Sequence, residues 1–127
     1  MGNDIDANFP KLINAICNAN LNVIYVIDPV HANTKKTING KKTRYIDDIV
    51  RETLKFIEIC NQNNIHWGGI HIEMTGLDVT ECVGCSIDEK DLDKKYLTTC
   101  DPRLNHEQCI YLANQIANFI KGRGSNV

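Results

Sequence analysis

Apolar residues recur every three or four positions in three stretches of the chain, which is the spacing of one face of an α-helix. This spacing predicts helices over residues 8–19, 46–61 and 106–121. Pro10 fits the first turn of the first helix, where no backbone N–H is needed. Asn105 suits the N-cap of the last helix, because its side chain can accept a hydrogen bond from the first turn. The pattern therefore predicts three amphipathic helices.

Short apolar runs rich in β-branched residues lie between these helices and predict strands. The first run covers residues 21–27 and ends at the breaker pair Asp28-Pro29. A second run covers residues 70–74, and a weaker signal covers 97–100. Polar, irregular stretches predict two long loops and a loose tail, at residues 30–44, 75–95 and 122–127.

The order helix, strand, helix, strand, strand, helix is typical of α/β folds, in which helices cover parallel strands. The chain has 127 residues, which is enough for one small core. Three strands cannot close a barrel, and a complete (β/α)8 barrel needs about twice this length. We therefore expect residues 1–127 to form one segment of a larger α/β fold.

The composition is that of an ordinary globular chain, with 43% hydrophobic residues, 24% charged residues and a net charge of -2. The basic residues are scattered, which argues against binding to nucleic acid. The longest apolar run, residues 23–27, is much shorter than a membrane span. The N-terminal stretch is polar and acidic, unlike a signal peptide. We therefore expect a cytoplasmic protein without a membrane partner.

Six cysteines are present, and in a small secreted chain an even number can form a disulfide framework. Three of them, Cys17, Cys60 and Cys109, fall on the apolar faces of the predicted helices. A free thiol packs there as a small hydrophobic group. We therefore expect reduced cysteines in a reducing compartment.

Side chains that can bind a metal gather where the predicted strands end. Asp28 and His31 follow the first strand, and His71 and Glu73 lie at the end of the second. Asp101 follows the third segment. In α/β barrels these strand ends carry the active site, and mixed imidazole and carboxylate ligands suit manganese, iron, cobalt or zinc. Each residue alone also fits a loop hydrogen bond or a helix cap, so the spacing leaves both interpretations open.

Four sequence blocks resemble the signatures of class II 3-deoxy-D-arabino-heptulosonate 7-phosphate (DAHP) synthases. They are DPVHANT (28–34), GKKTRYIDDI (40–49), GGIHIEMTGLDVTECVG (68–84) and CDPRLN (100–105). They follow the family's order with similar gaps and cover nearly the whole chain. The family has a (β/α)8 barrel, so the resemblance implies that this chain supplies its last three βα units. Ala32 and Cys85 depart mildly from the family, because glycine is usual at both positions.

The resemblance also implies a metal site. In the family a cysteine, a histidine, a glutamate and an aspartate bind a divalent metal, with manganese expected first and cobalt, iron or zinc as alternatives. The family's histidine, glutamate and aspartate fall on His31, Glu73 and Asp101. The cysteine ligand belongs to the first part of the barrel, and no residue of this chain matches it.

The implied reaction joins phosphoenolpyruvate to erythrose 4-phosphate, the first step of the shikimate pathway and of aromatic amino acid biosynthesis. The metal would act as a Lewis acid on the aldehyde oxygen. Both substrates are anionic and need basic partners, for which Lys42, Arg44 and Arg103 are the candidates. The alternatives are a solvated loop charge for Lys42 and Arg44, and a structural ion pair for Arg103. His71 shares a strand face with Glu73 and is expected to line or support the site.

Two other functions fit the same sequence. A non-catalytic remnant or interaction module would keep the three ligands and dock on a complete synthase. A small zinc-binding domain would instead need four ligands, for which Cys82, Cys85, Cys100 and His106 are available. Under the leading hypothesis we expect the isolated chain to be inactive and to need the rest of the barrel or a homo-oligomer.

Met1-Gly2-Asn3 resembles the end of a segment that precedes the first of these helices in the family. This resemblance suggests the hypothesis that the chain begins at an internal methionine of a longer protein.

Overall fold

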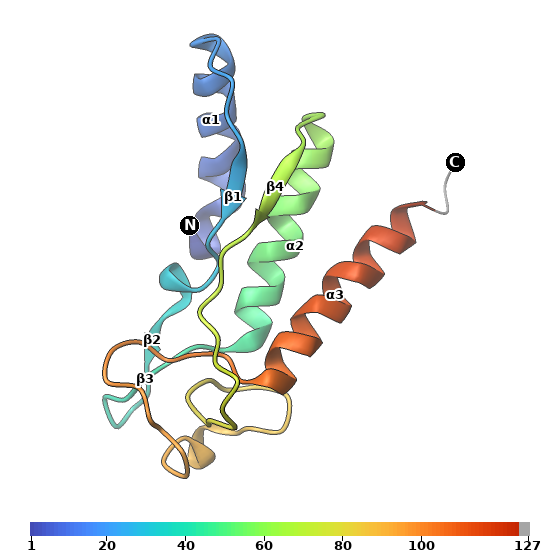
Figure 1. Cartoon of the computed structure of the whole chain (residues 1–127). Helices are drawn as coiled ribbons and strands as arrows, with labels where there is room; N and C mark the ends of the chain where they lie inside the picture. Colours follow the sequence, from blue (N-terminus) through green and yellow to red (C-terminus); the bar gives the residue numbers. More distant parts are fainter. Residues whose placement is uncertain (125–127) are drawn as a thin grey trace.

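The computed structural model describes residues 1–124 and is built on three long helices (Figure 1). Helix α1 spans Ile5–Asn18, α2 spans Ile46–Gln62 and α3 spans His106–Gly124. A 3-10 turn, Gly2–Asp4, leads into α1. Helix α2 packs against both α1 and α3, so it is the central helix of the three. The three predicted helices are therefore confirmed, and the last one is longer than expected. The first begins at Ile5 rather than at residue 8, so the prediction that Pro10 lies in its first turn is wrong and Pro10 lies inside the helix.

The predicted tail at residues 122–127 is wrong in its first part. Residues 122–124 continue α3, whereas 125–127 lie outside the described residues. None of the helices within residues 1–124 is long and apolar enough to cross a membrane.

The two main strands are parallel and lie beside α1 and α2 (Figure 1). Strand β1 spans Tyr25–Ile27 and β4 spans Trp67–Ile70. Both predicted strands are present, but the first is shorter than residues 21–27, and the second shares only Ile70 with residues 70–74. Ile24 is 80% exposed, and β1 pairs only with β4 within the described chain. The first run therefore has too little pairing to become a strand along its whole length.

The strand expected at residues 97–100 is absent from the structure. A single parallel bridge joins Met74 to Leu104 instead. The N–H of Leu104 donates to the carbonyl of Glu73 at 3.0 Å, and the N–H of Thr75 donates to the carbonyl of Leu104 at 3.0 Å. The third segment is thus aligned with the extension of β4, although only one residue of it pairs.

The long loops contain more structure than the sequence pattern predicts. Residues 30–44 include a 3-10 turn, His31–Asn33, and a small antiparallel hairpin of β2 (Lys35–Lys36) and β3 (Lys42–Thr43). The next loop contains a third 3-10 turn, Glu89–Asp91. A bridge between Tyr45 and Val83 ties this loop to the start of α2.

The start of α3 anchors the same loop. Asn105 and Gln108 bond each other's backbone N–H groups, at 3.0 and 3.2 Å, as in a capping box. Their amide groups also donate to the carbonyls of Val79 and Cys82 at 3.0 and 2.8 Å. Asn105 is therefore the helix cap that the sequence predicts, and it also holds the loop.

Two groups of buried side chains form the core. The first lies between α1, α2 and β1 and consists of Ile5, Phe9, Ile13, Ile27, Phe56, Ile57, Ile59 and Cys60. The second lies beneath the loops and consists of Val30, Ile46, Ile49, Cys82, Leu104 and Leu112. Cys60 is buried as predicted, and burial raises the pKa of its thiol to about 11. The prediction for Cys17 is wrong, because its side chain is exposed.

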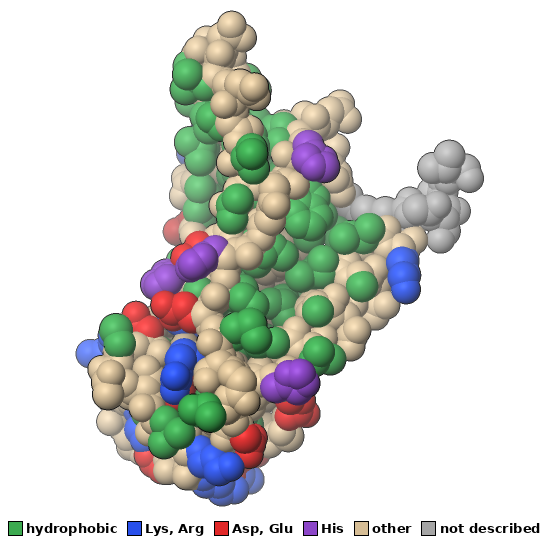
Figure 2. Space-filling model, in the orientation of Figure 1, with side chains coloured by type: hydrophobic (Ala, Val, Ile, Leu, Met, Phe, Trp, Pro, Cys, Tyr) green, Lys and Arg blue, Asp and Glu red, His purple; other side chains and the backbone are tan. Residues whose placement is uncertain are grey.

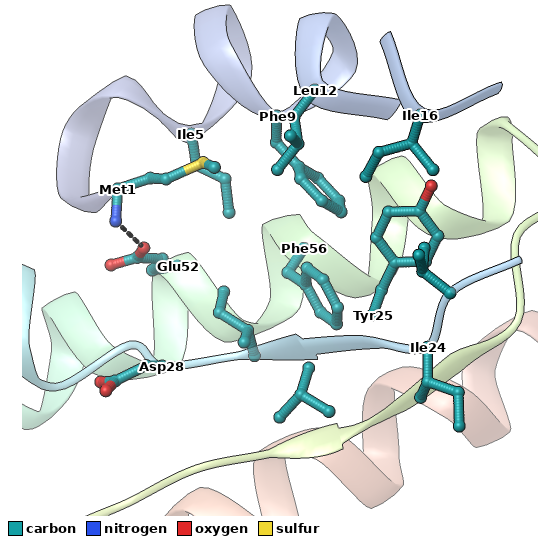
Figure 3. Close-up of a pocket in the computed structure, with 13 residues that line it drawn as sticks. Met1, Ile5, Phe9, Leu12, Ile16, Ile24, Tyr25, Asp28, Glu52 and Phe56 are labelled. Atoms are coloured by element: carbon teal, nitrogen blue, oxygen red, sulfur yellow. Dashed lines mark ion pairs between the residues drawn. The ribbon is translucent and has the colours of Figure 1, made fainter. Parts of the chain in front are cut away.

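Apolar surface also remains uncovered in this part of the chain. A cavity of about 390 Å³ opens between α1, β1 and α2, and Phe9, Leu12, Tyr25 and Phe56 point into it (Figure 3). Hydrophobic side chains also line the hollow between the strand pair and α3 (Figure 2). These uncovered surfaces flank the strand pair.

The backbone of Cys85 generates a first prediction. Its φ of 57° lies in the left-handed region, which costs an L-residue with a Cβ about 1–2 kcal/mol. Cys85→Gly removes this cost, against about 0.5–1 kcal/mol of added chain entropy in the unfolded state. We expect the free energy of unfolding in urea to rise by about 0.5–1 kcal/mol.

Cys85→Ala is the matched control, because it removes the exposed thiol but keeps the Cβ. Its stability should equal that of the parent chain. A glycine variant no more stable than the alanine variant would contradict the strain at this position.

Candidate metal centre

Three chain segments end side by side and carry the site. The first is β1, followed by Asp28 and the turn that begins at His31. The second is β4, which leads into His71 and Glu73, and the N–H of His71 still donates to the carbonyl of Ile27 at 2.7 Å. The third is the segment that reaches Leu104, which the bridge to Met74 holds in place. Parallel segments aligned in this way bring their C-terminal ends to one edge.

At this edge the side chains of His31, Glu73 and Asp101 converge. One potential ligand atom from each lies within 4.8 Å of the other two. Donor atoms that share one ion at about 2.0–2.2 Å lie at most about 4.4 Å apart, so a small side-chain adjustment would bring all three to one cation. The donor set, one imidazole nitrogen and two carboxylates, fits a divalent transition metal.

The ring of His31 lies between two carboxylates. Its Nδ1 is 2.6 Å from Oδ2 of Asp28, and its Nε2 is 3.1 Å from Oε1 of Glu73. The hydrogen bond with Asp28 is the main cause of a raised pKa for His31. Burial by itself would raise the pKa of Asp28, but the hydrogen bonds from His31 and Val30 hold it below its ordinary value. Because protons and metal ions use the same lone pair of Nε2, this arrangement also suits a bound cation.

Glu73 is held by a buried arginine. The guanidinium of Arg44 is fully buried, and its NH1 donates to Oε2 of Glu73 and to the carbonyl of Pro102, both at 2.5 Å. Its Nε donates to Oγ1 of Thr34 at 2.9 Å, whereas the buried NH2 has no partner among the described residues. Arg44 therefore lies beneath the three residues rather than in solvent. A substrate-binding role for it stays a prediction, and its burial favours a supporting role.

Asp101 has a cation of its own. Nζ of Lys42 is 2.8 Å from Oδ1 of Asp101, and this hydrogen bond lowers the pKa of Asp101 and raises that of Lys42. The Lys42 side chain is 47% exposed, so it can leave this pairing without a change in the fold. The sequence places Lys42 near the site, and the structure brings it into direct contact with one of the three residues.

His71 lies next to the site but makes no bond to Glu73. Its ring stacks on that of His31, with centroids 6.4 Å apart and an angle of 14° between the planes. It is exposed, and its role as a supporting or lining residue stays a prediction.

Arg103 is paired with a buried carboxylate that the sequence analysis did not identify. Its Nε and NH2 donate to the two oxygens of Glu81 at 3.0 and 2.7 Å, and its backbone N–H donates at 2.8 Å. Glu81 is fully buried and also accepts from the N–H of Leu97 at 3.2 Å. This ion pair is the structural alternative to a substrate-binding role for Arg103. Its side chain still lines a cavity of about 280 Å³ together with Glu73, Cys100 and Asp101.

A second buried carboxylate supports the turn of His31. Glu52 accepts from Nδ2 of Asn33 at 2.6 Å and from the N–H of Gly2 at 2.9 Å, and Figure 3 shows it beside Met1. A sequence signal for it existed, because it falls on the apolar face of its helix, three residues after Ile49. Glu81 lies in an irregular loop, where no periodicity could mark it as buried.

The proposed zinc site at Cys82, Cys85, Cys100 and His106 does not form. In the part of the chain that the structure describes, the only metal-compatible group of three or more ligands is His31, Glu73 and Asp101. Cys82 is buried with its thiol 3.4 Å from the carbonyl of Arg103, and burial raises its pKa to about 12. Cys85 and Cys100 are exposed. The cysteines are therefore spread between core and surface, and the zinc-domain interpretation is wrong.

Comparisons with known proteins find similar sequences along most of the chain. A family model described as the class-II DAHP synthetase family matches residues 1–117. The chain is 41% identical over 124 residues to the phospho-2-dehydro-3-deoxyheptonate aldolase of Streptomyces coelicolor. It is 40% identical over 124 residues to the aldolase AroG of Mycolicibacterium smegmatis, and 44% identical over 101 residues to an aldolase of Streptomyces lividans.

The matches cover this chain and its relatives to different extents. The first two include 95% of this chain but only 28% and 27% of the relatives, so the chain spans little more than a quarter of their length. The Streptomyces lividans match includes 78% of this chain and 69% of that protein.

The buried pair of Glu81 and Arg103 generates a prediction about stability. Burial by itself would raise the pKa of Glu81, but the bonds from Arg103 hold it below its ordinary value. Glu81→Gln leaves the arginine without its carboxylate and should cost about 2–3 kcal/mol of unfolding free energy at pH 7. Since the pKa is lowered on folding, this contribution is complete above the unfolded value of about 4.3. It is lost as the pH falls through the folded pKa.

Urea unfolding at neutral pH and at about pH 3.5, below the unfolded value, checks this dependence. The difference between parent and variant should shrink at the lower pH. Glu107→Gln is the control, because Glu107 is exposed and its glutamine still accepts from Ser86. A difference independent of pH would contradict the role of the ionised pair.

Proposed function

Because the chain belongs to the class-II DAHP synthetase family, we propose that it forms the part of a DAHP synthase that carries three of the four metal ligands. The observation that carries this proposal is the convergence of His31, Glu73 and Asp101. The resemblance selects these three residues from motifs alone. The fold brings them together from three separate segments.

The metal is proposed to be manganese, with cobalt, iron or zinc as alternatives that fit the same nitrogen and oxygen donors. When bound, it would supply a Lewis acid for the aldehyde oxygen of erythrose 4-phosphate. His31, Glu73 and Asp101 are the residues of this chain that would hold that ion. Lys42 and Arg44 offset the charge of those carboxylates, so the net charge of the site is less negative than the two carboxylates alone would make it.

The substrates are proposed to be phosphoenolpyruvate and erythrose 4-phosphate, as the family implies. Among the basic candidates Lys42 is the best placed to meet an anion, because it is half exposed and touches Asp101. Arg103 lines the cavity beside Glu73 and Asp101, but its guanidinium is engaged with Glu81. Arg44 is buried and would act on substrate only through Glu73.

We also propose that the chain completes a (β/α)8 barrel by packing against further polypeptide, either the remainder of such a barrel or another copy of the chain. The outer edge of β1 has no partner strand within the described residues. The apolar cavity lined by Phe9, Tyr25 and Phe56 opens beside that edge. A strand and a helix from such a neighbour would satisfy the backbone groups of β1 and cover this apolar surface.

A metal titration tests the proposed ligands. We expect the chain to bind Mn²⁺, and His31→Ala or Glu73→Ala to weaken binding by at least about tenfold, because each removes a donor atom. Affinity is measured by calorimetry, with circular dichroism to check that each variant is folded.

His106→Ala is the control, since His106 is exposed and lies outside the three-residue group. Its affinity should match that of the parent chain. Equal binding by parent, His31→Ala and Glu73→Ala would contradict the proposed site.

The isolated chain should not consume phosphoenolpyruvate, even with erythrose 4-phosphate and Mn²⁺ present. No residue here matches the family's cysteine ligand, and the side of β1 that would meet further polypeptide is open. A spectrophotometric assay of phosphoenolpyruvate checks this expectation. Consumption that depends on both erythrose 4-phosphate and Mn²⁺ would show that the chain is sufficient by itself.

A further inference from the structure

The side chain of Asp28 makes three hydrogen bonds with the turn that contains His31. Its Oδ1 accepts from the backbone N–H groups of Val30 and His31, at 3.1 and 3.2 Å. Its Oδ2 lies 2.6 Å from Nδ1 of the His31 ring. The backbone bonds fix the orientation of the carboxylate at the end of β1. Its second oxygen, Oδ2, is thereby directed at Nδ1 of the imidazole.

The contact between Oδ2 of Asp28 and Nδ1 determines which nitrogen of the neutral imidazole carries the proton. A neutral imidazole has one N–H donor and one lone-pair acceptor. A carboxylate oxygen faces each ring nitrogen, but the contact of Nδ1 with Asp28 is 2.6 Å and that of Nε2 with Glu73 is 3.1 Å. The shorter contact therefore places the single proton of the neutral ring on Nδ1. The lone pair is then on Nε2, which is the nitrogen that faces Glu73 at 3.1 Å.

We propose that Asp28 is a positioning residue that keeps Nδ1 of His31 protonated and thereby presents Nε2 to a divalent cation. This inference rests on the proposed metal function, although the choice of tautomer can be tested without a metal. The carboxylate also increases the electron density of the ring, and partners of this kind strengthen metal binding by imidazole.

No other described residue is recorded in contact with Nδ1. His71 stacks on the face of the ring and makes no hydrogen bond to it. Glu73 is on the Nε2 side and is itself a proposed ligand. The orientation of the His31 ring therefore depends on Asp28 and on the short turn that joins the two residues.

Asp28→Asn separates this role from the support of the turn. The asparagine oxygen can still accept from the two backbone N–H groups, so the turn is kept. The second oxygen is replaced by an NH₂ group, which donates and therefore favours an unprotonated Nδ1. We expect the proton to move to Nε2, which removes the lone pair that the cation needs.

The experiment uses the full 127-residue chain labelled with ¹⁵N. At high pH, where the imidazole is neutral, ring ¹⁵N shifts should show Nδ1–H for His31 in the parent and Nε2–H in Asp28→Asn. Calorimetric titration with Mn²⁺ should show binding about 10–100-fold weaker in the variant. Asp6→Asn removes a charge from a carboxylate that pairs with Lys55 instead, and both readouts should be unchanged.

The outcomes separate the inference from the proposed function. An Nε2–H tautomer in the parent, or one that Asp28→Asn leaves unchanged, overturns the inference whatever the metal result. Equal Mn²⁺ affinity in the parent and Asp28→Asn overturns it as well and leaves the metal function intact. If the parent binds no Mn²⁺, the proposed function fails, and the tautomer shift still decides what Asp28 does.

Discussion

The arrangement of the site depends on one buried guanidinium. Arg44 donates hydrogen bonds to three groups: the hydroxyl of Thr34, the carboxylate of Glu73 and the carbonyl of Pro102. Thr34 lies in the segment of His31, and Pro102 is next to Asp101. One side chain thus ties together the three segments that carry the candidate ligands. Removing a partner from a buried ion pair costs about 3–5 kcal/mol, because a charge is left without compensation. The segments are otherwise joined by only a few backbone bonds, so this contact is central to their alignment.

Each of the three carboxylates at the site has a basic partner. Asp28 faces His31, Glu73 faces Arg44, and Asp101 faces Lys42. These pairs differ in how easily they can change. Arg44 is buried and fixed, whereas Lys42 and His31 are about half exposed. The site thus combines a buried, fixed arginine with two half-exposed side chains that can change partners.

The surface of β1 that borders α1 differs from the strand ends that carry the site. It is apolar, it contains the cavity of about 390 Å³, and it has no ion-pair network comparable to the one at the strand ends within the described chain. Exposed apolar patches next to a free strand edge usually mark a surface that another segment covers. The proposed ligand residues lie where the strands end, so covering this surface need not cover them.

The sequence by itself determined the three helices and the α/β class, and it supplied His31, Glu73 and Asp101 as candidate ligands. Helix periodicity is local, and the family motifs name their residues directly, so neither depends on distant contacts. Only the tertiary structure decided where the second strand lies, that the third segment makes a single bridge, and that Arg44 is buried. Strand pairing and burial depend on partners far away in the chain, and a pattern of neighbouring residues does not contain them. The sequence pattern marks Asp28 as the end of a strand. Its contact with the His31 ring is a tertiary feature that the pattern does not contain.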